Sequence, residues 1–214
     1  RTVVAAAVDG SVAGLFVVAD RIKTSSPQAI AELRALGLTP VLLTGDNERT
    51  ALAVAAEAGI EQVIANVLPE DKSAIVSRLQ ADGEVVAMVG DGVNDAPAMA
   101  NSTVGIAMGA AGSDVALETA DVALMADDLT HLPFAVGLSR STSRIIKQNL
   151  WVSLGVVAVL IPATIFGLNI GTAVLFHEGS TLLVVVNALR LLAYQATAQQ
   201  AIAAQPGTPV AHRG

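Results

Sequence analysis

The sequence contains no cysteine, which excludes disulfide bonds and thiolate metal sites within the chain. Aromatic residues are also scarce, at 3% of 214 residues, whereas hydrophobic residues make up 53%. This composition is too apolar for an ordinary water-soluble domain, so a membrane segment is expected. No secretory leader is visible, because Arg1 leads directly into strand-like sequence. The lack of an initiator methionine suggests a piece of a longer protein.

Acidic residues outnumber basic residues in the first part of the chain. Residues 1–147 carry ten basic and eighteen acidic side chains, a balance of −8, and residues 148–214 carry two and one, a balance of +1. Nucleic-acid binding needs a basic footprint, so no nucleic-acid partner is expected. The length suffices for one sizeable core, or for a modest domain plus a membrane piece.

Strand-like and helix-like segments alternate along the first part of the chain. Two β-rich runs at 2–9 and 12–18 flank a turn and predict a hairpin. From Ser25 onward, strand and helix alternate, which favours an α/β fold with a doubly wound parallel sheet over residues 21–128. The predicted strands cover residues 39–43, 63–64, 85–89, 104–107 and 122–125, and the predicted helices cover residues 25–36, 48–58, 68–80 and 113–119, with another opening near Asn94.

The motif Gly-Asp-Gly-Val-Asn-Asp-Ala-Pro at residues 90–97 follows a predicted strand that reads as buried on both faces. It places Asp91 and Asp95 at the carboxyl end of a parallel strand, where open α/β sheets bind ligands. Carboxylates used sparingly suit Mg²⁺, and glycines such as Gly92 let the backbone approach a phosphate. The alternative is an ordinary Asp-Gly turn before a helix cap, which the complete motif disfavours.

Two further loops add to this motif. One carries Thr44, Gly45 and Asp46, and the other leads to Lys72. Together the three loops supply a hydroxyl with backbone N–H groups, a cation and carboxylates, which are the parts that phosphoryl transfer needs. Taken singly, Thr-Gly-Asp is as often a turn, and a lysine at a helix start is more often only solvated. The order and even spacing of all three carry the hypothesis.

Two long apolar stretches follow the α/β part. Residues 149–168 contain no charge and are long enough to span a bilayer, with Pro162 tolerable inside a membrane helix. Residues 172–193 form a second span. Residues 129–148 are expected to be a stalk helix, and residues 195–214 a disordered tail.

Positive charges flank the two spans at one side. Arg140, Arg144 and Lys147 precede the first span, and Arg190 lies at the far end of the second. The positive-inside rule therefore predicts a plasma-membrane hairpin whose turn faces outward and whose residues 1–147 are cytoplasmic.

His-Glu-Gly-Ser-Thr at residues 177–181 interrupts the second span. Ionisable side chains in mid-bilayer are costly, so they indicate function by default. His177 and Thr181 lie on one helix face, Glu178 and Thr181 are three apart, and Gly179 permits a close helix approach. Imidazole nitrogen with carboxylate oxygen suits a borderline divalent metal. The alternative is a shallow pair at the outer interface that binds water.

The sequence resembles the haloacid dehalogenase-like phosphotransferases and, more specifically, the P-type ATPases. The resemblance rests on Thr-Gly-Asp-Asn at 44–47, Leu-Pro-Glu-Asp-Lys at 68–72 and the motif at 90–97, and it covers roughly residues 12–193. It implies a haloacid dehalogenase-like, Rossmann-type phosphorylation domain at 21–128, with residues 1–20 ending a nucleotide-binding domain. The helix at 177–192 is similar to that of the cobalt-type heavy-metal branch, whereas copper-type relatives carry methionine and serine there.

The resemblance also implies roles for individual residues. By this resemblance, Asp91 and Asp95 are expected to hold Mg²⁺ beside an aspartyl phosphate. Lys72 and Thr44 are expected to contact that phosphate. The remaining assignments are Gly45 and Asp46 in the catalytic loop, Gly92 as a cofactor contact, Asn94 with Asp95 in ordering the loop, and Asp20 as a hinge acid. The implied cofactors are Mg²⁺ and ATP, and the implied cargo at His177, Glu178 and Thr181 is a divalent cation such as Co²⁺, Zn²⁺ or Cd²⁺.

The family's phosphorylated Asp-Lys-Thr-Gly motif is absent, as are its Thr-Gly-Glu and its Cys-containing metal motif. All three precede residue 1 in family order, so the chain is expected to be a C-terminal fragment that is inactive alone and needs the missing N-terminal domains. One alternative is a membrane-anchored, non-catalytic binding or regulatory protein of the same fold. A second is a soluble phosphatase with an apolar tail, which the lack of a nucleophilic Asp before Thr44 disfavours.

Overall fold

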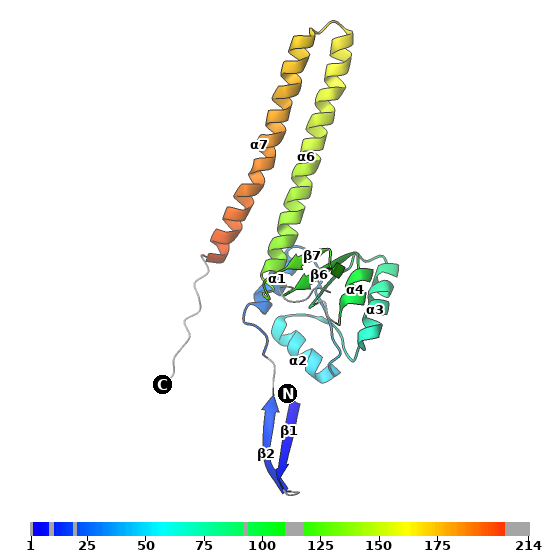
Figure 1. The fold of residues 1–214 in the computed structure, drawn as a ribbon, viewed down its shortest axis with the longest axis vertical. Helices are drawn as coiled ribbons and strands as arrows, with labels where there is room; N and C mark the ends of the chain where they lie inside the picture. Colours follow the sequence, from blue (N-terminus) through cyan, green and yellow to red (C-terminus); the bar gives the residue numbers. More distant parts are fainter. Residues whose placement is uncertain (1, 9–10, 19–20, 92–93, 110–117, 204–214) are drawn as a thin grey trace. The chain divides into compact units, whose positions relative to one another are not determined.

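The computed structural model describes residues 2–8, 11–18, 21–91, 94–109 and 118–203. Contacts divide the chain into two compact units, Arg1–Pro133 and Phe134–Gly214. The first unit holds the strands and short helices, and the second holds most of two long helices (Figure 1).

The chain begins with the predicted hairpin. Strands β1 (Thr2–Val8) and β2 (Ser11–Val18) pair antiparallel, with a register shift between Ala6 and Ala7. The turn at residues 9–10 and the hinge acid Asp20 lie outside the described residues.

Over residues 21–91, 94–109 and 118–203, five short parallel strands form two hydrogen-bonded sheets rather than one continuous sheet. Strand β3 (Val41–Leu43) pairs with β4 (Gln62–Ile64), and the order of the second sheet is β5 (Ala87–Gly90), β6 (Val104–Met108), β7 (Val122–Leu124). All three of these pairings are parallel, so the α/β fold with parallel strands is confirmed.

One expectation about the central strand is wrong. Residues 85–89 were expected to be buried on both faces, but β5 begins only at Ala87, and Val85 is 83% exposed. Among the described residues, strand β5 has a hydrogen-bonded neighbour on one side only, β6, and Met88 is the one buried side chain of β5. Met88 joins a small core of Val76, Ala98, Met99 and Ala107.

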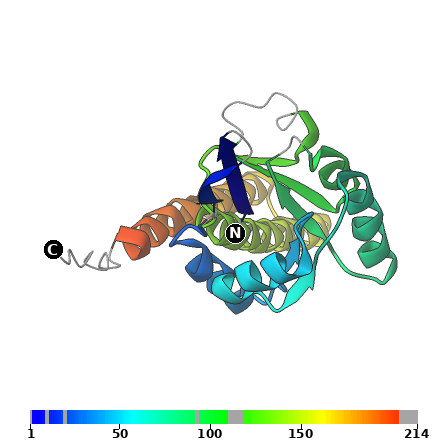
Figure 2. The ribbon, with the colours of Figure 1, turned by 90° about the horizontal axis from the view of Figure 1, so that it is seen from below.

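The helices of the first unit start and stop at the signals in the sequence. Their bounds are α1 (Ser26–Ala35), α2 (Glu48–Ala58), α3 (Pro69–Ala81) and α4 (Ala96–Asn101). Asn47 caps α2 by accepting from the Thr50 backbone N–H at 3.0 Å, and Gly59 ends it with φ 76°. Helix α3 contacts α4, and α1 contacts α2 (Figure 2). The helix expected at 113–119 falls largely outside the described residues, although Glu118 and Thr119 are helical.

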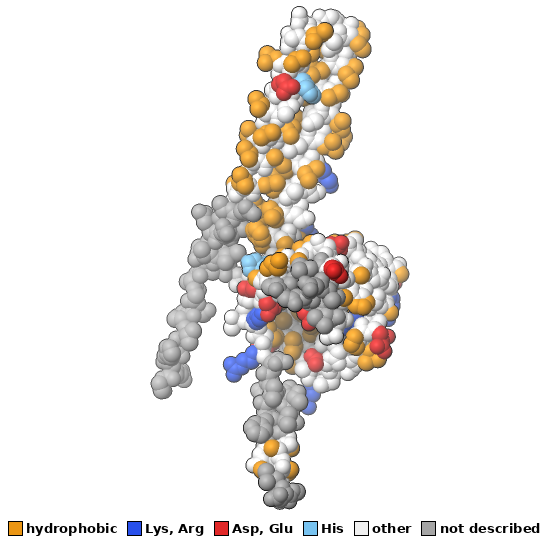
Figure 3. All heavy atoms as spheres, in the orientation of Figure 1, with side chains coloured by type: hydrophobic (Ala, Val, Ile, Leu, Met, Phe, Trp, Pro, Cys, Tyr) orange, Lys and Arg blue, Asp and Glu red, His pale blue; other side chains and the backbone are white. Residues whose placement is uncertain are grey.

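The second unit is built from α6 (His131–Ile165) and α7 (Ile170–Ala203). Both are long and apolar enough to cross a membrane, with the second candidate span ending at Tyr194. Helix α6 continues through Pro162, and hydrophobic side chains cover much of both helices (Figure 3). Helix α7 also runs past residue 195 to Ala203, so the expected disordered tail is wrong over residues 195–203.

Candidate functional site

Asp91 lies at the carboxyl end of strand β5, as the sequence predicts. The strand ends at Gly90, so Asp91 is the first residue beyond the carboxyl end of a parallel strand. Gly90 is needed there for space: a Cβ on it would lie 2.5 Å from Asp95 Oδ2 and 2.7 Å from Asp95 Cβ. The missing side chain of Gly90 therefore lets the carboxylate of Asp95 fold back against the strand end.

That carboxylate meets the predicted lysine. Lys72 Nζ lies 2.6 Å from Asp95 Oδ1, and each side chain is 15% exposed. Lys72 stands in the first turn of α3, whereas Asp95 is the residue before α4. This short, largely buried ion pair fixes the ammonium group beside the end of β5.

The Thr-Gly-Asp loop after β3 is held by hydrogen bonds of its own. The Thr44 hydroxyl donates to Asp46 Oδ2 at 3.2 Å and accepts from the Asp46 N–H at 3.1 Å. Backbone bonds then tie this loop to the segment after β4, from Asn66 N–H to Asp46 C=O at 2.8 Å and from Val67 N–H to Thr44 C=O at 3.1 Å. The hydroxyl is thereby oriented at the carboxyl edge of the β3–β4 sheet.

The structure brings some of the predicted residues together and leaves others apart. It joins Lys72 to Asp95 and Thr44 to Asp46. Gly92 lies outside the described residues, and Asn94 is exposed at the edge of that gap. Within the described part of the chain, no group of three or more His, Asp or Glu side chains is arranged to hold a metal ion. The magnesium assignment of Asp91 and Asp95 stays a prediction, with Asp95 already engaged by Lys72.

The predicted cargo residues stand on α7. His177 and Glu178 are both exposed in the described chain, and the helix runs without a break through residues 177–181. The hydroxyls of Ser180 and Thr181 donate to the His177 carbonyl at 2.6 and 3.2 Å. Thr181 keeps its oxygen lone pairs for a ligand, because its hydroxyl proton is used within the helix.

Sequence reasoning missed a joint at the start of α6. The Ser25 hydroxyl donates to Asp128 Oδ1 at 3.1 Å, the Thr130 N–H donates to the same oxygen at 3.0 Å, and Lys23 Nζ lies 2.5 Å from the Asp127 carboxylate. The backbone hydrogen bond from Thr130 is the largest cause that lowers the pKa of Asp128, with side-chain bonds and nearby His131 adding to it against the opposing effect of burial. The signal was an Asp two residues before a Thr at a helix start.

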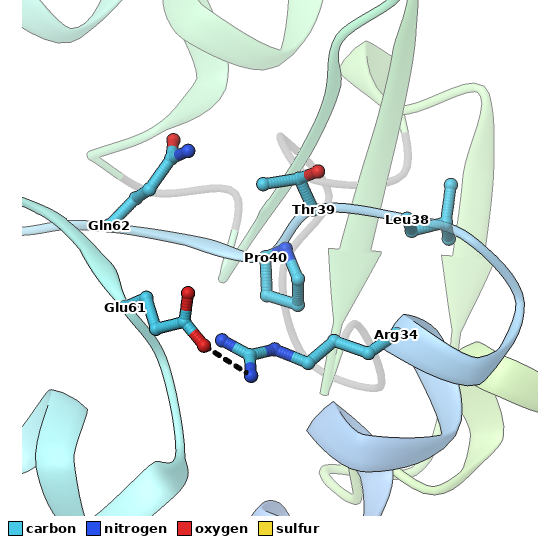
Figure 4. Close-up of a pocket in the computed structure, with 6 residues that line it drawn as sticks. All are labelled: Arg34, Leu38, Thr39, Pro40, Glu61 and Gln62. Atoms are coloured by element: carbon cyan, nitrogen blue, oxygen red, sulfur yellow. Dashed lines mark ion pairs between the residues drawn. The ribbon is translucent and has the colours of Figure 1, made fainter.

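A pocket of about 250 Å³ lies elsewhere, at the amino ends of β3 and β4 (Figure 4). The ion pair between Arg34 and Glu61, 2.8 Å apart, is part of its lining. Thr44 and Asp91 follow the opposite, carboxyl ends of their strands, so this pocket is separate from the candidate site.

Comparison with known proteins gives consistent matches. Residues 1–103 match the family model for haloacid dehalogenase-like hydrolase. The copper-exporting P-type ATPase of Bacillus subtilis is 48% identical over 195 residues, which cover 89% of this chain and 24% of that protein. A probable cadmium-transporting ATPase of Staphylococcus aureus is 45% identical over 194 residues, covering 90% of this chain and 24% of that protein. The crystal structure of a zinc-transporting PIB-type ATPase in its E2·Pi state gives a TM-score of 0.78 at 44% identity, covering 89% of this chain and 31% of that chain.

The matches first define the class: the α/β part is a haloacid dehalogenase-like hydrolase domain. The chain as a whole is homologous to the C-terminal part of heavy-metal P-type ATPases, membrane proteins with transmembrane helices, and it has two candidate spans of its own. It spans about a quarter of the length of these relatives.

Proposed function

We propose that this chain is the phosphorylation domain and last membrane hairpin of an ATP-driven exporter of divalent heavy-metal cations. The observation that carries the proposal is the carboxyl edge of the parallel strands, where Asp91 follows β5 beside the Lys72–Asp95 pair. Carboxylate, ammonium and hydroxyl groups at such an edge suit phosphoryl transfer, and the chain continues into two apolar helices.

The donor set at this edge fits Mg²⁺. Asp91 supplies hard carboxylate oxygens, and Mg²⁺ in phosphate sites is held by one or two carboxylates together with phosphate oxygens. Asp91 is the residue that would hold the ion, which neutralises charge on phosphate when bound. Lys72 adds a positive charge, which Asp95 keeps in position. The Thr44 hydroxyl, which donates to Asp46 Oδ2 in the structure, would turn from that carboxylate to donate to a phosphate oxygen.

The proposed cargo is a divalent ion of the Co²⁺, Zn²⁺ and Cd²⁺ class. His177 offers nitrogen and Glu178 oxygen, and α7 contains no methionine. Overall identity does not rank the metals, because relatives named for copper and for cadmium are 48% and 45% identical. The side chains on α7 therefore carry this part of the proposal.

The test is ATP hydrolysis by a complete transporter that includes these 214 residues, measured with each divalent metal and with Cu⁺. We expect stimulation by a divalent ion and an acid-stable phosphoenzyme, whereas the 214-residue chain alone hydrolyses no ATP. Stimulation by Cu⁺ alone would refute the cargo class. ATP hydrolysis without any phosphoenzyme would refute the mechanism.

A companion measurement addresses the alternative of a non-catalytic membrane protein. Binding of Zn²⁺ by the isolated chain in detergent, combined with no phosphoenzyme in the complete protein, would favour that alternative over the exporter.

A further inference from the structure

The two membrane helices are joined by a chain of polar side chains. The Asn187 Nδ2–H of α7 donates to Asn149 Oδ1 of α6 at 2.8 Å, and Arg190 Nη1 donates to Asn187 Oδ1 at 2.9 Å. A longer contact of 3.4 Å reaches Gln148 Oε1. Asn149 and Asn187 are half-buried, whereas many neighbouring apolar side chains, such as Leu150 and Leu189, are exposed.

The direction of each hydrogen bond follows from the groups themselves. Arg190 can only donate, so the oxygen of the Asn187 amide must face it. The Asn187 nitrogen then faces α6, and Asn149 must present its oxygen. Both hydrogen bonds therefore run in one direction, from Arg190 to Asn187 and from Asn187 to the amide oxygen of Asn149.

A second contact between the helices lies closer to their predicted cytoplasmic ends. The rings of Phe134 and Tyr194 have centroids 6.1 Å apart, and a Cβ on Gly137 would overlap the Tyr194 hydroxyl. Contacts at two levels define both the spacing and the register of the pair. Only the polar contact lies beside the apolar stretch, where a lost hydrogen bond cannot be replaced readily by water.

We propose that Asn149, Asn187 and Arg190 form a positioning lock that sets the register of α7 against α6. Through that register the lock fixes the depth at which α7 presents its cargo residues. Asn187 precedes Arg190 by one turn and follows His177 by ten residues, or about 15 Å of helix. The positioning role rests on the proposed function, because it assumes that His177 and Glu178 bind the cargo.

The first arm of the test uses the 214-residue chain itself in detergent. The chain has no cysteine, so Ser153→Cys with Leu183→Cys allows spin labels on facing helices. We expect a narrow label-to-label distance distribution for the otherwise unchanged chain and for Asn149→Asp, which keeps the acceptor. Asn149→Leu removes the acceptor and should broaden or displace the distribution. Identical distributions for Asn149→Leu and the unchanged chain would overturn the lock.

The second arm measures cargo-stimulated ATP hydrolysis in the complete transporter. Asn149→Leu should raise the KM for the metal by about threefold to twentyfold with kcat changed by less than about twofold, while Asn149→Asp stays near wild type. The double variant Asn149→Leu with Asn187→Leu should be no worse than Asn187→Leu alone, because Asn187→Leu already removes the hydrogen bond to Asn149 together with the one from Arg190. Ser153→Leu, the same kind of change at an exposed polar residue one turn further along α6, should leave KM unchanged.

Together, the two arms distinguish a failure of the proposed function from a failure of the positioning role. If the unchanged transporter shows no metal stimulation, the proposed function and the positioning role both fall, while the label distances still decide whether the lock sets the register. If the transporter is stimulated but Asn149→Leu has a wild-type KM, the positioning role alone is wrong. Equal damage from Asn149→Asp and Asn149→Leu would also overturn it, since the retained acceptor would then make no difference.

Discussion

Gly90 ends β5 without a side chain, and Asp95 occupies the space that a Cβ would need. Gly90→Ala should therefore displace Asp95, break its ion pair with Lys72 and destabilise the first unit by about 1–3 kcal/mol. Thermal unfolding of the chain in detergent measures the effect. Gly14→Ala is the matched control, because nothing lies within 4 Å of a Cβ there. Equal melting temperatures for the two variants would contradict this account of Gly90.

Asp128 gives a residue-scale prediction about pH. Its pKa is lowered in the folded chain, chiefly by the Thr130 backbone N–H, so the ionised form is the one that the fold stabilises. This stabilisation is fully present above the ordinary pKa of about 3.9 and is lost as the pH falls through the lower folded pKa. The melting-temperature difference between wild type and Asp128→Asn should hold steady from about pH 8 to 5 and shrink as the pH falls below about 4. A difference that stays constant down to pH 3 would contradict it.

Some residue positions at the candidate site could be predicted from the sequence, whereas the contacts between them could not. The place of Asp91 was predictable, because an apolar strand followed by Gly-Asp-Gly sets it at a strand end. The pairing of Lys72 with Asp95 was not, since it joins positions 23 residues apart and depends on how α3 and the start of α4 meet. The hydrogen bond from Ser25 to Asp128 was missed for the same reason, because the two residues are 103 positions apart in the sequence.

At the scale of elements, local signals set most helix boundaries. Pro27, Asn47, Gly59 and Pro69 each mark a helix end as expected, because their effects act within one turn. Burial was harder to predict, as the exposure of Val85 shows, because it depends on which strands become neighbours. The continuation of α7 to Ala203 follows an Ala- and Gln-rich segment whose helix propensity outweighed its lack of an apolar stripe.

The cap of α2 supports an element-scale prediction. Asn47→Ala removes the side-chain acceptor for the Thr50 N–H and should lower the free energy of unfolding by about 1 kcal/mol. Asn47→Asp keeps an acceptor and should stay near wild type. Denaturant unfolding of both variants makes the comparison, and equal losses would show that the cap bond contributes little.

For the whole molecule, phosphorylation and cargo binding are assigned to two sets of residues in different units of the chain. Asp91 belongs to the α/β domain and Glu178 to a membrane helix, so their variants should fail differently in the complete transporter. Asp91→Asn should reduce phosphoenzyme formation at least about a hundredfold, both from ATP and from inorganic phosphate, because the carboxylate that would hold Mg²⁺ at the phosphate is lost. The same change at exposed Asp82, just past α3, is its control.

Glu178→Ala should lower metal-stimulated turnover at least about tenfold, yet leave phosphorylation from inorganic phosphate intact. That back reaction needs the α/β domain but no bound cargo, so its survival would locate the defect in the membrane. Leu175→Ala, on the same helix at a side chain that is 72% exposed, controls for a general loss of packing. Phosphoenzyme from both substrates and metal-stimulated turnover, measured on one preparation, distinguish the two sites.

Unchanged metal stimulation in Glu178→Ala would return His177 and Glu178 to the alternative of a shallow, water-binding pair. A loss of phosphorylation from inorganic phosphate would instead mean that Glu178 acts on the α/β domain, against the division proposed here.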